Sequence, residues 1–202
     1  MYRTLTPSKL EAILDDHLKW VRGEGGARAD LSRANLSNTD LCWATLNGAH
    51  LRKTNLCKAN LRAANLCRAD LRGAHLSGAN LTGATLRGAQ VSYEALVSAN
   101  TSAIARDVWD VLDHAQNEAD GLLKALLAGH VEGSAYSGLC ACLVGTLANV
   151  RGCHYQQLPG IVPRALRPAE RWFVAIREGD TPENSPFSRL AAEWVMQWLA
   201  RK

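Results

Sequence analysis

The chain has 202 residues, 47% of them hydrophobic, and a formal net charge of +4. A chain of this length and apolar content is expected to fold into one or two compact units, which excludes intrinsic disorder. The sequence has no stretch typical of a signal peptide or of a bilayer-spanning helix, so we expect a soluble, cytoplasmic protein without a membrane partner.

The first predicted element is a helix over residues 6–22. Thr6 followed by Pro7 is a typical helix start, and the glycines at 23, 25 and 26 are expected to end the helix. Apolar residues recur between them at helical spacing, namely Leu10, Ile13, Leu14, Leu18 and Val21. We interpret residues 1–27 as a capping segment, because the end of a repeat structure exposes apolar side chains and unpaired backbone.

A repeat with a period of five occupies residues 28–93. Each unit is centred on a large apolar residue, with a small residue two positions before it and usually Asp or Asn directly before it. Glycine often stands two positions after the centre. The centres are Leu31, Leu36, Leu41, Leu46, Leu51, Leu56, Leu61, Leu66, Leu71, Leu76, Leu81, Leu86 and Val91. This period matches neither the 3.6-residue period of a helix nor the two-residue period of a strand.

A square coil, with one unit on each side, accommodates the period of five. Four units then make one turn, and ladder hydrogen bonds join coils that lie about 4.8 Å apart. The centre and the small residue face the interior, while Asp, Asn and Gly suit the corners. We therefore expect Leu56, Leu61 and Leu66 to lie inside. Basic side chains such as Arg52 and Lys58 are expected outside.

Segments such as Ala79-Asn80-Leu81-Thr82-Gly83 resemble the consensus of the pentapeptide-repeat family, known from bacteria and phages. The resemblance covers about a third of the chain and implies a right-handed quadrilateral β-helix. Together with the flanking segments it predicts a mixed β and α protein: this β-helix, an N-terminal capping helix and a C-terminal α-helical domain. The family includes strongly acidic, dimeric DNA mimics that protect gyrase. The repeat here has nine basic and three acidic residues, hence +6, which disfavours that role.

Residues 94–202 are predicted to form the α-helical domain. Apolar residues recur at helical spacing from Ile104 to Leu126, which indicates one long amphipathic helix. Further helices are predicted at about 137–150, 168–178 and 187–200. Pro168 is well placed to begin one of them.

Four basic residues share one side of the predicted coil, because they flank centres twenty residues apart: Arg33, Arg52, Lys53 and Arg72. Such a face is suited to contact phosphates or an acidic protein surface. The alternative is a solvated face that only keeps the protein in solution.

Three thiols and one imidazole in the C-terminal part have the ligand types of a zinc site: Cys140, Cys142, Cys153 and His154. A helix would point the first two about 200° apart, so we favour buried, reduced thiols and no metal. The sequence also lacks Gly-x-Ser-x-Gly, phosphate-loop and His-Glu-x-x-His motifs. We therefore expect no catalytic residues and no cofactor.

The last predicted helix carries an apolar stripe of Trp194, Val195, Trp198 and Leu199. We predict a homodimer joined through this stripe, because tryptophan is enriched at interfaces and two-fold dimers are the commonest closed assembly. The alternative is that the four residues pack within a monomeric helical domain.

The leading functional hypothesis is a non-enzymatic interaction or scaffold protein, which presents a rigid β-helix surface to a protein partner and self-associates through its C-terminal helices. The second hypothesis is nucleic-acid binding through the basic face. A gyrase-directed DNA mimic is a further alternative that the positive charge disfavours. An enzyme or metal site in the helical domain is the remaining one.

Overall fold

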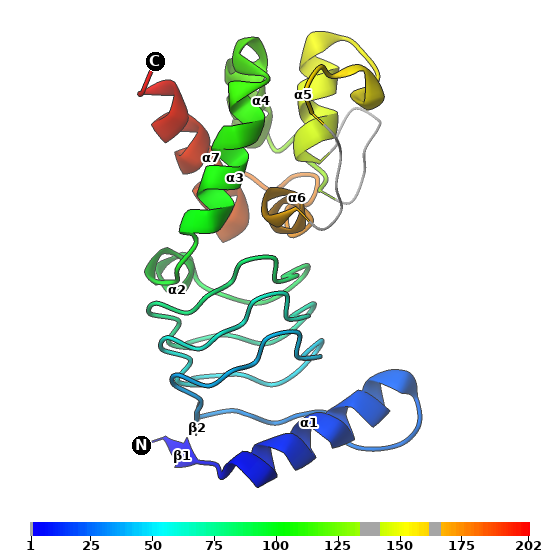
Figure 1. Ribbon diagram of the computed structural model, residues 1–202, viewed down its shortest axis with the longest axis vertical. Helices are drawn as coiled ribbons and strands as arrows, with labels where there is room; N and C mark the ends of the chain where they lie inside the picture. Colours follow the sequence, from blue (N-terminus) through cyan, green and yellow to red (C-terminus); the bar gives the residue numbers. More distant parts are fainter. Residues whose placement is uncertain (1, 134–141, 162–166) are drawn as a thin grey trace. The chain divides into compact units, whose positions relative to one another are not determined.

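The computed structural model describes residues 2–133, 142–161 and 167–202 (Figure 1). The chain separates into two compact units, Met1–Thr101 and Ser102–Lys202. The predicted capping segment and the repeats, expected as separate domains, thus share one unit. That unit also includes residues 94–101, which the sequence had assigned to the helical domain.

The N-terminal unit begins with β1 (Arg3–Thr4), which was not predicted, followed by α1 (Pro7–Arg22). The side chain of Thr6 caps α1 by accepting a hydrogen bond from the Lys9 N–H. Gly23 ends the helix in the left-handed region, at φ 72°. The helix predicted over residues 6–22 is therefore confirmed.

The repeats form stacked coils, drawn in cyan and green in Figure 1. Parallel bridges join residues twenty apart at four successive places along the chain: Asp30 with His50, Asn35 with Asn55, Asp40 with Asn60, and Thr45 with Asn65. The same spacing continues through the later coils. Each five-residue unit thus supplies one bridging position, which explains the period of the sequence.

The coil interior is filled by the repeat centres and the small residues before them. All the leucine centres from Leu31 to Leu86 are at most 2% exposed. Leu56, Leu61 and Leu66 are fully buried, whereas Arg52 and Lys58 are exposed. The predicted division between inside and outside is confirmed for these residues.

The corners use two devices that follow from residue type. Where Asp or Asn precedes a centre, its side chain accepts a hydrogen bond from the N–H two residues on, as Asp30 Oδ1 does from Ser32 at 2.9 Å. The residue two after the centre has a positive φ in every unit from 33 to 88. Glycine adopts this conformation without strain, as at Gly73, but Trp43 and Ala63 adopt it too.

The coils extend beyond the boundary predicted at residue 93. A short helix, α2 (Tyr93–Ser98), interrupts the pattern, yet Leu96 stays fully buried and keeps the five-residue register. Asn100 then forms a parallel bridge with Asn80. Ala99–Asn100 repeats the pair of a small residue and Asn, so the sequence did contain the signal for this continuation.

α1 is joined to the first coil through side chains near its C-terminal end. His17 is fully buried, and its Nδ1 accepts a hydrogen bond from the Ala29 N–H at 3.1 Å. Asp16 Oδ2 accepts another from the Ala27 N–H at 3.0 Å. The Trp20 ring stacks on His17, with 5.4 Å between the ring centroids. These contacts satisfy backbone groups where the first coil begins.

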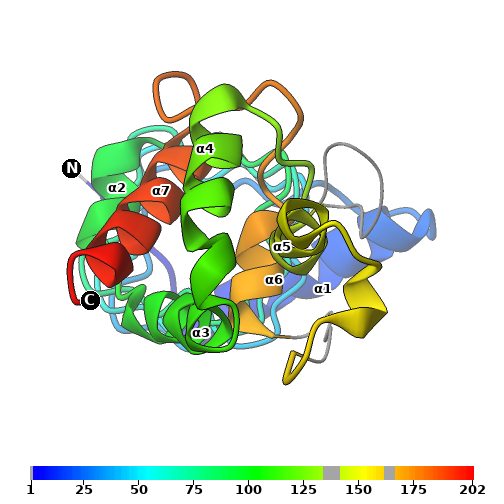
Figure 2. The ribbon, with the colours of Figure 1, turned by 90° about the horizontal axis from the view of Figure 1, so that it is seen from above.

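The C-terminal unit is built from helices (Figure 2). They are α3 (Ser102–Asp113), η1 (Gln116–Glu118), α4 (Ala119–Ala128), α5 (Leu143–Arg151), η2 (Tyr155–Gln157), α6 (Pro168–Phe173) and α7 (Pro186–Leu199). α4 packs against α7 and α5, and α3 packs against α6 and α7. None of the helices in the described part of the chain is long and apolar enough to cross a membrane.

Residues 104–126 do not form the single long helix that their periodicity predicts. Ala115 leaves the helical region at φ −136° and ψ 49°, and the short turn η1 separates α3 from α4. In that turn, the buried carboxylate of Glu118 binds the Arg151 guanidinium of α5, with 2.8 Å between Nε and Oε1. The chain therefore changes direction without a glycine or proline that would have marked the break.

Two further helices are shorter than predicted. α6 begins at Pro168 as expected but ends at Phe173 instead of residue 178. The helix predicted from about residue 137 is described from Leu143, because residues 134–141 lie outside the described part of the chain. The helix predicted at 187–200 corresponds to α7.

Candidate functional site

The four basic residues predicted to share a face lie on the same side of the coils. The Arg33 N–H donates to the Arg52 carbonyl at 2.9 Å, and the Lys53 N–H donates to the Arg72 carbonyl at 3.0 Å. Successive coils thus bring together residues that are about twenty positions apart in the sequence.

Asp70 interacts with two of these four residues, Arg52 and Arg72, and not with Arg33 or Lys53. Its carboxylate accepts hydrogen bonds from Arg72 Nε at 2.9 Å and Nη2 at 2.7 Å, and Arg52 Nη1 lies 4.0 Å away. The hydrogen bond from Arg72, assisted by the charge of Arg52, lowers the pKa of Asp70. Arg33 and Lys53, by contrast, form no ion pair with any described residue.

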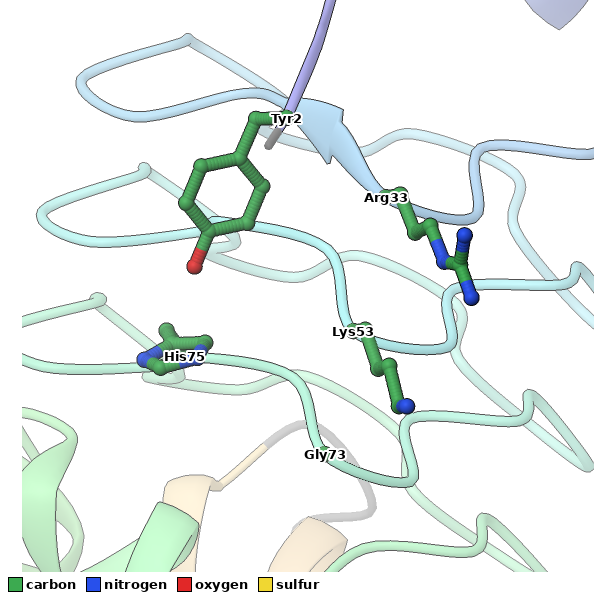
Figure 3. A pocket seen from close by; sticks show the side chains of 5 residues that line it. All are labelled: Tyr2, Arg33, Lys53, Gly73 and His75. Carbon is green, nitrogen blue, oxygen red and sulfur yellow. The ribbon is translucent and has the colours of Figure 1, made fainter.

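Arg33 and Lys53 line a pocket of about 430 Å³ together with Tyr2, Gly73 and His75 (Figure 3). Arg33, Lys53 and Gly73 occupy the same position of successive coils, and all have a positive φ. Gly73 leaves the third position without a side chain: a Cβ there would lie 3.2 Å from Lys53 Cγ. The missing side chain keeps the space beside Lys53 open.

Tyr2 and His75 form another part of the pocket wall, with their rings edge to face and 6.0 Å between centroids (Figure 3). β1 positions Tyr2, because β1 pairs in parallel with β2 (Ala34–Asn35) and Arg3 lies in register with Ala34. His75 forms a parallel bridge with Asn55 of the preceding coil. The pocket therefore combines the N-terminal strand with two coils of the repeat.

The sequence predicted only half of this site. Arg33 and Lys53 follow from the twenty-residue register, whereas Tyr2 lies outside the repeat and carries no pattern that relates it to them. His75 could have been placed beside Asn55 by counting twenty residues, but only as a solvated corner residue. The lining has two cations and no carboxylate, so its chemistry suits an anion.

The four residues considered for a metal site do not form one in the described part of the chain. Cys142 is buried at the start of α5, whereas Cys153 and His154 follow its other end. A nine-residue helix separates the two groups by about 14 Å. Cys140 lies outside the described residues, and no three His, Cys, Asp or Glu side chains among those described gather into a metal site.

The apolar stripe predicted as a dimer interface lies largely inside the C-terminal unit. Trp194 and Trp198 are 4% exposed, Val195 is fully buried, and Leu199 is half-buried. Trp198 Nε1 donates a hydrogen bond to Asp113 Oδ1 at 2.9 Å. The three buried side chains belong to the core of this unit, so the interface cannot be placed on them. The predicted homodimer itself stays a prediction.

A family model described as pentapeptide repeats matches residues 27–62 and 59–92, with eight copies. None of the curated proteins matches the sequence. Among solved structures, the chain is similar to a pentapeptide repeat protein from the Arabidopsis thaliana thylakoid lumen. The two are 26% identical, with coverage of 32% of this chain and 48% of that one and a TM-score of 0.23. The chain thus spans about half the length of that protein.

Two similar structures come from cyanobacteria. A pentapeptide repeat protein from Nostoc PCC 7120 is 29% identical, with coverage of 46% of this chain and 79% of that one and a TM-score of 0.18. The second is HetL, a pentapeptide repeat protein involved in heterocyst differentiation regulation from Nostoc sp. strain PCC 7120. It is 34% identical, with coverage of 32% of this chain and 43% of that one and a TM-score of 0.11. On the matched repeat copies, residues 27–92 are pentapeptide repeats.

Proposed function

We propose that this protein is a non-enzymatic interaction protein. Its coils form a right-handed, four-sided β-helix that presents the pocket of Arg33 and Lys53 to an acidic protein partner. One observation carries the proposal: these two cations are exposed on successive coils and have no ion-pair partner among the described residues. α1 is bound to the start of the first coil through His17 and Asp16, whereas Arg33 and Lys53 lie on a side of the coils.

The charges of the face favour an acidic partner there. Like charges on neighbouring coils are about 4.8 Å apart at the backbone and repel each other. Asp70 removes this repulsion for Arg52 and Arg72. An acidic surface would supply negative charge to Arg33 and Lys53, and hydrogen bonds between coils hold the backbone of both residues in position before binding.

The test compares three forms of the protein as baits in an extract of the native host. The double variant Arg33→Gln/Lys53→Gln removes the pocket charges. The control variant Lys58→Gln/Arg68→Gln removes two exposed cations from the same coil position on other sides. We expect one partner to be retained by the wild type and the control, and roughly tenfold less by the pocket variant. Equal retention by all three would reject the proposal.

A second candidate function is binding of single-stranded nucleic acid. The specific observation in its favour is that the rings of Tyr2 and His75 lie beside Arg33 and Lys53, because single-strand binders combine aromatic rings with basic side chains. Titration with a labelled oligonucleotide should then show affinity that falls steeply between roughly 50 and 200 mM salt. Absence of binding at the lower salt concentration would exclude this function.

A further inference from the structure

We infer that the pocket of Tyr2, Arg33, Lys53, Gly73 and His75 binds a phosphate monoester in its dianionic form. The inference rests on the proposed function, because it names the chemical group through which an acidic partner would be recognised. It depends on three features of the pocket: the number of its charges, the space beside Lys53 and the polar groups of its wall.

The charge of the pocket matches a dianion. A phosphate monoester carries close to two negative charges at neutral pH, whereas a phosphodiester carries one. Arg33 and Lys53 supply two positive charges that are not committed to a described carboxylate. Arginine binds two phosphate oxygens at once through its planar group, and lysine adds a mobile point charge. Asp70 does not neutralise Arg33 or Lys53, because its carboxylate is already bound to Arg72 and lies close to Arg52.

The space in the pocket is suited to a small group. Its volume of about 430 Å³ is in the range of small-molecule sites, roughly 300–1,000 Å³. Gly73 creates this space, since any side chain at that position would meet Lys53 Cγ. Tyr2 and His75 also line the pocket, with the Tyr2 hydroxyl toward the His75 ring, and both side chains can hydrogen-bond to phosphate oxygens or to the group that carries them (Figure 3).

The neighbouring side of the coil provides a matched control. Asn38, Lys58 and Gly78 occupy the positions that correspond to Arg33, Lys53 and Gly73, with positive φ values of 57°, 57° and 68°. A Cβ at Gly78 would lie 3.4 Å from Lys58 Cγ, close to the spacing in the pocket. This column has one cation where the pocket has two, so it is not expected to hold a dianion.

The full-length protein is titrated with phenyl phosphate and, separately, with methyl phenyl phosphate, and binding is followed by the amide NMR signals of Arg33 and Lys53. We expect the monoester to bind at least tenfold more tightly than the diester, since the diester lacks one charge. Equal affinity for the two esters, or no binding of the monoester, would overturn the inference.

Paired variants place the binding in this pocket. Lys53→Gln removes one cation and Gly73→Asn fills the open position, and each should weaken phenyl phosphate binding roughly tenfold. Asparagine is chosen because it tolerates a positive φ. The corresponding changes Lys58→Gln and Gly78→Asn should leave the affinity unchanged. Weakening by Lys58→Gln as large as that by Lys53→Gln would assign the phosphate to another site and reject the inference.

Two further probes distinguish the source of the phosphate. A phosphoserine peptide that binds more tightly than glucose 6-phosphate would identify a phosphorylated protein segment, and the reverse order would identify a free small molecule. The inference fails while the proposed function survives if no phosphate monoester binds but Arg33→Gln/Lys53→Gln still loses its protein partner. The proposed function fails alone if phosphate binds and partner retention does not depend on these residues.

Discussion

The imidazole of His17 accepts a hydrogen bond from the backbone N–H of Ala29, and this bond connects α1 to the first coil. An imidazole nitrogen accepts a hydrogen bond only when it carries no proton. Burial of the ring, together with the nearby charge of Arg28, lowers the pKa of His17 from its ordinary value. The contact between the helix and the coil therefore depends on a neutral histidine.

We expect the stability of the N-terminal unit to fall on acidification because of His17. The unfolded chain binds a proton at the ordinary pKa of 6.5, and the folded chain binds it only at lower pH. The stabilising contribution is thus complete above the unfolded pKa and lost as the pH falls through the folded value. Urea unfolding between about pH 8 and 5 should show a decline that is smaller in His17→Gln. The control is the exposed residue His130: His130→Gln should keep the wild-type slope.

Leu61→Arg should prevent the repeat from folding. Leu61 is fully buried in the coil interior, where a guanidinium would lose its hydration and find no carboxylate. Circular dichroism and amide exchange would show loss of structure, while Arg62→Ala, at the adjacent exposed position, should fold normally. A well-folded Leu61→Arg protein would contradict the assignment of the interior.

Ala63→Gly should stabilise the protein. Ala63 has a φ of 56°, and a left-handed conformation costs a non-glycine residue roughly 1–2 kcal/mol. Glycine loses more backbone entropy on folding, so the net gain should be about 0.5–1 kcal/mol. The neighbouring change Ala64→Gly tests the explanation. Ala64 is fully buried, so the same substitution there should destabilise the protein. Denaturant midpoints measure both effects.

The repeat was predictable because one local rule recurs at every unit, so that the register alone places Arg33 above Lys53. Contacts between distant segments were not predictable, since nothing in the sequence relates Tyr2 to His75. The break between α3 and α4 was missed for a similar reason: Glu118 in the turn pairs with Arg151, which is distant in the sequence, and the apolar period continues through the break. Periodicity likewise identified the buried stripe of α7 but could not tell a core from an interface.

Glu170 should make the C-terminal unit less stable as the pH rises. It is 2% exposed and lies against the Cys142 thiol of α5, and burial raises its pKa to about 7 despite the nearby Arg167. Its contribution is complete below the ordinary value of 4.5 and lost as the pH rises through about 7. Glu170→Gln should remove this dependence from unfolding curves. The exposed control Glu183→Gln should retain it.

Trp198→Ala should destabilise the C-terminal unit without acting through a dimer. The side chain is buried, bonds to Asp113, and has Lys202 Nζ 4.9 Å from its ring centroid. Removal of such a tryptophan costs roughly 3–5 kcal/mol. The predicted homodimer is tested separately, by light scattering of the wild type at micromolar concentration. A mass equal to the single 21.9 kDa chain would contradict the homodimer.

The twenty-residue coil makes the surface of this protein sensitive to the size of an insertion or deletion. Loss of a single five-residue unit between Arg33 and Lys53 would preserve the repeat pattern but rotate every later residue by one side, so the two cations would no longer meet. Insertion of twenty residues would lengthen the stack and leave each later residue on its original side. Sites that span several coils can therefore be inherited through duplication of whole turns, while gain or loss of a single five-residue unit erases them and leaves the repeat pattern intact.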